Sequence, residues 1–208
     1  MTLQTVFAAT GNPGKLREFV GHAESGVEVR PLPAFETIPP CEETGKTFEE
    51  NARLKAAYYS KHIDGLVFAD DSGLEVSALR GGPGVYSARF AGPDASDEEN
   101  NARLLAALAG VPAALRDARY VCVIALARRG EVVSTFLGMA SGVILEMPRG
   151  TGGFGYDPYF LFPPLNQTFA EISAEEKWKY SHRGKAFRKM LAFLRIIDSR
   201  GQQETQGN

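Results

Sequence analysis

Short apolar runs alternate with glycine- and proline-rich breaks along this chain. Residues 6–9 are apolar and lead into a Thr-Gly-Asn-Pro-Gly break at 10–14. This order is typical of a strand followed by a loop, and a helix is expected from residue 15 to about residue 23. Further apolar runs at 27–32 and 66–69 are expected to be strands. The pattern predicts a mixed α/β fold with an extensive sheet.

Three helix starts carry the capping-box pattern, in which a Ser or Thr oxygen and a Glu carboxylate satisfy each other's free amides. The pattern begins at Thr47, Ser96 and Ser173, each with Glu three positions later. Apolar residues at helical spacing over 187–197 predict a final helix. The polar residues 201–208 are expected to form a disordered tail.

The second half of the chain predicts a hairpin. Residues 120–127 and 132–136 read as its two strands around an Arg-Gly turn, and 140–145 as a further strand. A glycine-rich loop is expected at 150–157. Because no repeat or linker divides the chain, residues 1–200 are expected to form a single domain.

Composition narrows the function classes. The chain has 208 residues, a formal net charge of −2 and a pI near 6.0, so it lacks the excess of basic residues typical of nucleic-acid binders. The two cysteines show no CxxC spacing, which argues against a zinc site and a disulfide framework. The chain has neither a signal-peptide pattern at its start nor an apolar run of 18 residues. A soluble, cytoplasmic protein without a membrane partner is expected.

The first candidate site is the break after the first strand. Small residues before a helix start let backbone amides approach a phosphate, and the helix N-terminus favours an anion. It is not a P-loop, since Leu16 follows the lysine. A tight turn with a solvated lysine is the alternative. The segment consists of Thr10, Gly11, Asn12, Pro13, Gly14 and Lys15.

Asp70 and Asp71 form the second candidate, at the expected end of the strand at 66–69. Two buried acids are costly unless a cation compensates them. Oxygen ligands of this kind suit Mg²⁺, which uses one or two carboxylates together with waters and substrate phosphates. A helix cap or a turn is the alternative. Glu42 and Glu43, in a loop, are further possible ligands.

Two further clusters bear donors and aromatic rings. The loop containing Phe154, Tyr156 and Asp157 could stack a base, or Phe154 could instead fill the core. The second cluster is rich in hydrogen-bond donors; it includes Lys177 and continues into the expected start of the last helix. Cations at a helix start are unfavourable because of the helix dipole, unless an anionic or carbonyl partner is present. A solvated charged face is the alternative there. The other residues of this second cluster are Ser181, His182 and Arg183.

Together these motifs resemble the non-standard purine nucleoside triphosphate pyrophosphatases, the inosine triphosphatase-like family. The most specific pieces are Asp-Asp-Ser-Gly at 70–73, Gly-Tyr-Asp-Pro at 155–158 and Ser-His-Arg at 181–183. The matching segments run in family order from Val6 to about Ile197. The resemblance implies a two-lobed α/β fold, in which a long mixed sheet is flanked by helices and the active-site cleft lies between the lobes. It also implies a homodimer.

The implied activity is Mg²⁺-dependent hydrolysis of dITP, ITP and XTP to the monophosphate and pyrophosphate, which keeps these nucleotides out of DNA and RNA. Asp71 would act as general base and metal ligand, with Glu42 as the second ligand. Glu43 stays open as an alternative to Glu42. The implied substrate-binding residues are Thr10, Gly11, Asn12, Pro13, Gly14, Lys15, Ser72, Phe154, Gly155, Tyr156, Asp157, Lys177, His182 and Arg183.

One position departs from the family pattern. Trp178 stands where Asn usually follows the Glu-Lys pair, and its bulk could shift the pocket around Lys177. Two other functions compete: a nucleotide-binding sensor, and a pyrophosphatase acting on modified pyrimidines or methylated bases. Carboxylates beside phosphates argue against a sensor, because like charges repel unless a metal intervenes.

Overall fold

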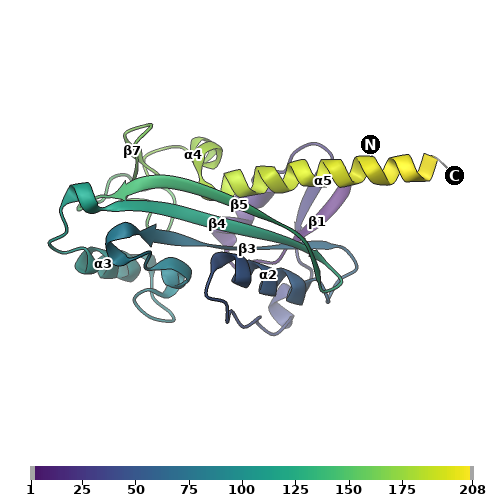
Figure 1. The fold of residues 1–208 in the computed structure, drawn as a ribbon, viewed down its shortest axis with the longest axis horizontal. Coiled ribbons are helices and arrows are strands. Elements are labelled where there is room, and N and C mark those ends of the chain that lie inside the picture. The colour runs from purple at the N-terminus through teal and green to yellow at the C-terminus, as the bar shows by residue number, and fades with distance from the viewer. Residues whose placement is uncertain (1–2, 207–208) are drawn as a thin grey trace.

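Seven strands form one mixed sheet in a computed structural model of the chain, which describes the backbone of residues 3–206 and the side chains of residues 3–197 (Figure 1). The strand order is β2-β1-β3-β4-β5-β6-β7. β1 pairs in parallel with β2 and β3, and the later pairs are antiparallel. The strands are β1 (Gln4–Ala8), β2 (Val27–Pro31), β3 (Leu66–Val76), β4 (Asp117–Arg128), β5 (Glu131–Ile144), β6 (Phe160–Phe162) and β7 (Gln167–Thr168).

Helices cover both faces of this sheet. Figure 1 shows α5 along one face of β4 and β5, and α2 on the opposite face. The capping boxes at Thr47 and Ser96 are complete, and Ser173 accepts a hydrogen bond from the amide of Glu176. The helices are α1 (Pro13–Gly21), α2 (Phe48–Tyr59), α3 (Asp97–Ala107), α4 (Ala174–Tyr180) and α5 (His182–Gln206). Short 3₁₀ turns are η1 (Phe35–Thr37), η2 (Ser77–Leu79), η3 (Gly84–Arg89) and η4 (Ala113–Leu115).

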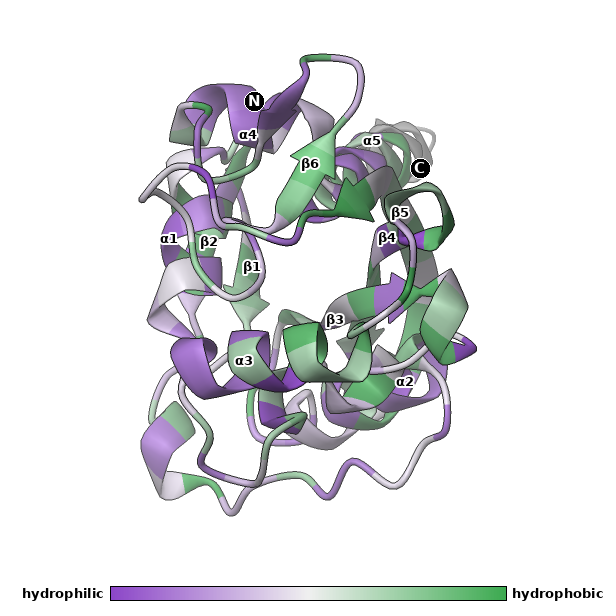
Figure 2. Cartoon of the chain, turned by 90° about the vertical axis from the view of Figure 1, so that its left-hand side faces the viewer, coloured by the Kyte–Doolittle hydropathy of each residue, from purple (hydrophilic) through white to green (hydrophobic). Residues whose placement is uncertain are grey.

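Three apolar clusters divide the molecule into two lobes. One cluster, which includes Phe19 and Phe187, packs α1 and α5 on the sheet, and a second, with Ala52, packs α2 on the other face. The third, with Leu104 and Phe160, surrounds the far ends of β3, β4 and β5. Figure 2 shows hydrophobic strands between helices that carry many hydrophilic residues, with α3 and α4 on opposite sides. The α/β fold predicted from the sequence is confirmed.

Two strands are longer than the sequence predicts. β3 continues through Asp70 and Asp71 to Val76, so the two acids lie within a strand and not at its end or in a turn. β5 is one strand where two were expected. The glycines within this strand serve close packing. A Cβ at Gly138 would lie 2.0 Å from the carbonyl oxygen of His182, and one at Gly142 would also clash.

The last helix also runs further than expected. α5 extends to Gln206, whereas a disordered tail was predicted from residue 201 onward. A glycine inside a helix costs only about 1 kcal/mol relative to alanine, and the Gln and Glu residues that follow Gly201 are good helix formers. Residues 207 and 208 of the predicted tail lie outside the described residues.

Candidate active site

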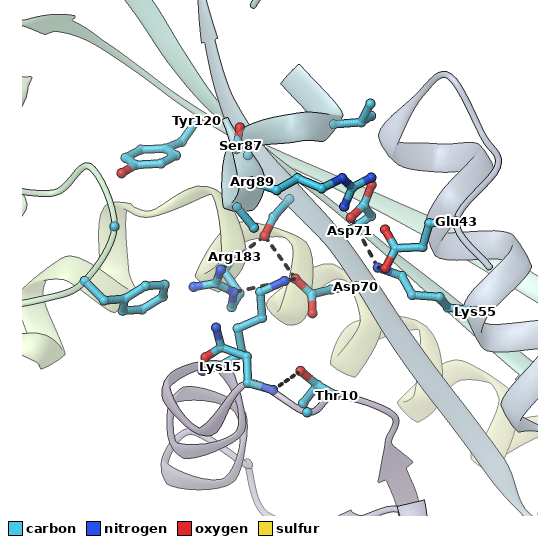
Figure 3. Close-up of a pocket in the computed structure, with 18 of the residues that line it drawn as sticks. Thr10, Lys15, Glu43, Lys55, Asp70, Asp71, Ser87, Arg89, Tyr120 and Arg183 are labelled. Carbon is cyan, nitrogen blue, oxygen red and sulfur yellow. Dashed lines mark hydrogen bonds and ion pairs between the residues drawn. The ribbon is translucent and has the colours of Figure 1, made fainter. Parts of the chain in front are cut away.

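A cleft of about 400 Å³ lies between the two lobes, at the carboxyl end of β1 (Figure 3). β1 pairs with β3 only as far as Ala8 and Phe68. From residue 69 to 76, β4 is therefore the only strand of the sheet that pairs with β3, and on the other edge Glu75 forms an isolated bridge with Pro83. The carboxyl ends of parallel strands are a common place for ligand sites in α/β sheets.

Asp70 and Asp71 face opposite sides of β3, because neighbouring residues on a strand alternate. Asp70 points toward α1 and α5, where it pairs with the ammonium of Lys15 at 2.8 Å and accepts a hydrogen bond from the Ser72 hydroxyl at 3.1 Å. Burial opposes ionisation of Asp70, but Lys15 and Arg183 outweigh it and hold the pKa of this carboxyl at about 2. Asp70 is a buried, permanently ionised anchor for cations.

Asp71 points toward α2. Its carboxylate accepts hydrogen bonds from Asn51 and Lys55, each at 3.2 Å. These two donors are four residues apart on α2 and so lie on one face of the helix. Burial raises the pKa of Asp71, and the nearby Glu43 carboxylate raises it further. Asp71 is therefore the more basic of the two carboxylates, and it is oriented by two fixed donors.

The geometry beside Asp71 fits a divalent cation. The ammonium of Lys55 lies between the carboxylates of Asp71 and Glu43, at 3.2 and 3.1 Å, so two oxygen ligands already converge on one positive charge. Mg²⁺ usually takes one or two carboxylates and completes its shell with water and phosphate. Within residues 3–197, no group of three or more His, Cys, Asp or Glu side chains is arranged to hold a metal.

The family resemblance implies Glu42 as the second metal ligand, while the residue pattern left Glu42 and Glu43 both open. In the structure Glu42 is exposed and is not among the residues that line the cleft, whereas Glu43 lies in the cleft beside Lys55. Adjacent residues of a loop have no periodicity that would tell from the sequence which side chain points inward. Glu43 is therefore the acid that the fold places next to Asp71.

The segment from Thr10 to Lys15 comprises the loop after β1 and the first residues of α1. Asn12 caps this helix, accepting a hydrogen bond from the amide of Lys15 at 3.0 Å, and its own amide donates to the Thr10 hydroxyl at 3.2 Å. Thr10, Gly11, Asn12 and Lys15 line the cleft, whereas Pro13 and Gly14 form the first helical turn behind it. The helix N-terminus and Lys15 together favour an anion.

Phe154 does not fill the core. Its ring is partly exposed at the cleft, with the Lys177 ammonium 4.6 Å from its centroid and the Arg183 guanidinium carbon at 5.4 Å. Lys177 forms a buried ion pair with Asp157. A flat face between cations is suited to stacking a planar ring.

Gly155 and Tyr156 hold the 150–157 loop in place. Gly155 donates its amide to the carboxylate of Asp97 at 2.6 Å and accepts from the Asn101 side chain at 2.9 Å. The buried Tyr156 donates its hydroxyl to the carbonyl oxygen of Ser87 at 2.7 Å. Both Gly155 and Tyr156 also line the cleft.

The start of α5 carries His182 and Arg183, both buried. The His182 ring stacks on Tyr120 at 4.6 Å, and its Nδ1 has no hydrogen-bond partner among the described residues. Burial lowers the pKa of His182 well below its ordinary range, and the neighbouring cations lower it further, so the ring is neutral at pH 7. Arg183 pairs with Glu18 at 2.5 Å and donates to the Ser72 hydroxyl at 3.2 Å.

Several residues that line the cleft or hold its side chains were not anticipated from the sequence. Glu18, three positions after Lys15 in α1, holds both Arg183 and, at 3.7 Å, Lys177. Helical spacing from Lys15 could have suggested it. The remaining residues of this kind reach the cleft only through tertiary packing, and no local signal marks them. They are Lys55, Arg89 and Tyr120, which line the cleft, and Asn51, which donates to Asp71 without lining it.

Trp178, the departure from the family pattern, does not line the cleft. It is buried between α1 and α5, edge-on to Phe19 and Phe187, and stacks on His22 at 4.3 Å. Its bulk therefore enters the core, while Lys177 beside it points to the cleft.

Residues 6–193 match the model of the Ham1 family. A dITP/XTP pyrophosphatase of Exiguobacterium sibiricum is 50% identical over 91% of this chain and 96% of its own, and one from Yersinia pseudotuberculosis is 47% identical over 93% and 99%. The solved Ham1 protein of Staphylococcus aureus superposes with a TM-score of 0.83 at 41% identity, covering 93% of this chain and 100% of its own.

Proposed function

This chain belongs to the Ham1 family, and on that premise we propose that it hydrolyses dITP, ITP and XTP to the nucleoside monophosphate and pyrophosphate. The removal of these nucleotides would prevent their incorporation into DNA and RNA. Its relatives named dITP/XTP pyrophosphatases match over nearly their full length. The observation that carries the proposal is the position of Asp71, a basic carboxylate held by two donors, in a cleft with an anion-binding helix start.

In this mechanism Asp71 accepts the proton of a water whose oxygen attacks the α-phosphorus. The bond from the α-phosphorus to the α,β-bridging oxygen breaks, and pyrophosphate leaves with that oxygen. Lys15 and the amides at the start of α1 stabilise the negative charge on the phosphates. Asp71 and Glu43 would hold Mg²⁺, which when bound neutralises phosphate charge and lowers the pKa of water.

Base choice follows from the donors at the other end of the cleft. Lys177 and Arg183 only donate hydrogen bonds, and neutral His182 can donate from one ring nitrogen. Hypoxanthine and xanthine present a 6-carbonyl acceptor to these donors, whereas adenine presents an amino group. Because the site would leave buried polar groups unpaired, adenine is expected to be rejected by as much as ~10⁴-fold. The same donors accept the 6-carbonyl of guanine, so its rejection would rest on the 2-amino group.

Three finer features belong to the same proposal. The metal is Mg²⁺, the protein acts as a homodimer, and it works in the cytoplasm. The paired carboxylates of Asp71 and Glu43 support the metal. No helix in the described part of the chain is long and apolar enough to cross a membrane. Sedimentation analysis of the purified protein tests the dimer.

The test of the activity is product analysis with ITP, XTP, GTP and ATP. Pyrophosphate and the monophosphate should appear together, only with a divalent metal, and kcat/KM for ITP and XTP should exceed that for ATP and GTP by at least roughly tenfold. The lead over ATP should shrink in Arg183→Ala. Release of orthophosphate with a nucleoside diphosphate would show that the cleavage site is wrong, and equal use of ATP and ITP would refute the donor pocket.

A further inference from the structure

Among residues 3–197, one cationic side chain that lines the cleft forms no ion pair. Five cationic side chains line the cleft, and four of them form ion pairs there. Those four are Lys15 with Asp70, Lys55 with Glu43 and Asp71, Lys177 with Asp157, and Arg183 with Glu18. Arg89, also in the lining, has no ion pair within residues 3–197, and its guanidinium carbon lies 5.4 Å from the centroid of the Tyr86 ring.

The backbone that carries Arg89 is held firmly to β3. Ser87, in the same η3 turn, accepts a hydrogen bond from the amide of Leu74 at 2.8 Å. The turn lies so close to the strand that a Cβ at Gly73 would be 2.4 Å from the Ser87 hydroxyl oxygen. Asn100 of α3 bonds backbone groups on both sides of Arg89, at 3.2 and 2.9 Å. The backbone of Arg89 is therefore fixed, while its guanidinium group is available to a ligand.

The direction of the side chain identifies the part of the substrate it meets. Figure 3 shows Arg89 extending toward Asp71, Glu43 and Lys55, and away from Arg183 at the base-binding end. Lys15 and Lys55 also serve this end, but their charges are already balanced by protein carboxylates. A triphosphate entering here brings several further negative charges, and an arginine fork matches phosphate oxygens in two-point geometry.

We propose that Arg89 binds the β- and γ-phosphates of the substrate and stays in contact with the pyrophosphate that leaves. The inference rests on the proposed function, since it names the residue that receives the leaving group of that reaction. Arg89 comes from the lobe opposite Lys15, so the pyrophosphoryl group is held from both sides of the cleft.

The experiment measures inhibition of the full-length enzyme by its products. Steady-state hydrolysis of ITP is followed at fixed Mg²⁺ with added inorganic pyrophosphate or added IMP, for wild type, Arg89→Ala and Arg89→Lys. Because Arg89→Ala removes a charge-assisted hydrogen bond to phosphate, it should weaken inhibition by pyrophosphate by about tenfold to a hundredfold and lower kcat/KM for ITP similarly. Inhibition by IMP, which lacks the β- and γ-phosphates, should change less than about threefold, and Arg89→Lys should lie between wild type and alanine.

Arg103→Ala is the matched control. Its guanidinium also lies over an aromatic ring, that of Phe90 at 5.8 Å, but Arg103 is exposed on α3 and does not line the cleft. This variant removes the same charge and should behave as wild type. The inference is overturned if Arg89→Ala binds pyrophosphate as wild type does, or if pyrophosphate and IMP inhibition weaken equally. If wild type releases no pyrophosphate from ITP, the proposed function fails, and calorimetric binding of pyrophosphate to wild type and Arg89→Ala still decides the role of Arg89.

Discussion

Replacing Asp70 by Asn is expected to destabilise the protein by about 2 to 4 kcal/mol, whereas Asp71→Asn should change stability by less than about 1 kcal/mol. Asp70 is fully buried against Lys15 and close to Arg183. One pKa unit is about 1.4 kcal/mol, so a pKa lowered from 3.8 to about 2 corresponds to about 2 kcal/mol. Breaking buried pairs by removing one partner costs about 3–5 kcal/mol. The amide keeps one oxygen for Lys15, which favours the lower part of the range.

The ionised carboxylate of Asp71 affects folding stability in the opposite direction to that of Asp70. A carboxyl whose pKa is higher in the folded state contributes stability that is fully present below its unfolded pKa and is lost as pH rises through its folded pKa. Ionised Asp71 at neutral pH therefore adds nothing to stability, and the amide oxygen of Asn can still accept from Asn51 and Lys55. Asp71→Asn should instead lower the turnover rate strongly, because loss of a general base costs about 10²–10⁴-fold in rate.

The assay is urea and thermal unfolding of both variants at pH 7.5 in EDTA, so that no metal contributes, together with pyrophosphate release at saturating Mg²⁺. For a chain of this length the Asp70 variant should lose roughly 4–16 °C in Tm. Equal destabilisation by the two substitutions would contradict the assignment of a stabilising role to Asp70 and a catalytic role to Asp71. An Asp71→Asn enzyme that keeps most of its kcat would refute the general base.

Two further outcomes are expected. The pKa of His182 lies well below that of an unfolded histidine because of burial and the adjacent charges of Arg183 and Lys177, so its neutral burial stabilises the fold above pH 6.5 and that stability is lost as pH falls. Between pH 7.5 and 5.5, wild type should lose about 1 kcal/mol more unfolding free energy than His182→Gln in urea titrations; equal losses would contradict this. Gly73→Ala should lower Tm by several degrees, because its Cβ would lie 2.4 Å from the Ser87 hydroxyl oxygen, and an unchanged Tm would show that the η3 turn is not tightly packed.

Local features of the site could be predicted from the sequence. The cap by Asn12, the capping box at Thr47 and the helix start at His182 each depend on residues within one turn of each other. The interactions that form these helix ends involve only residues close in sequence. The sequence therefore predicts both the helix and the charged groups at its end. The resemblance implied that Phe154, Lys177 and Arg183 hold the nucleotide, and the fold brings both cations to the Phe154 ring.

Features that depend on strand length or on packing between elements were not predictable. The Asp-Asp-Ser-Gly sequence interrupts an apolar run, and this looks like a strand end, yet pairing with β4 carries β3 five residues beyond Asp71. Lys55 and Asn51 lie on a helix face that looks solvated until the helix packs beside β3. Arg89 reaches the cleft only because Gly73 allows η3 to lie against the strand.

Strand geometry also explains how two neighbouring acids can have unlike properties. In a loop, Asp70 and Asp71 would share one environment, and each would raise the pKa of the other. On a strand they point to opposite faces, so cations from α1 and α5 surround Asp70 while α2 supplies the donors to Asp71. Because β1 stops pairing with β3 at Ala8, before the two acids, both faces still border the same cleft. One short segment thus supplies an ionised anchor for the nucleotide-binding side and a basic carboxylate for the hydrolytic side.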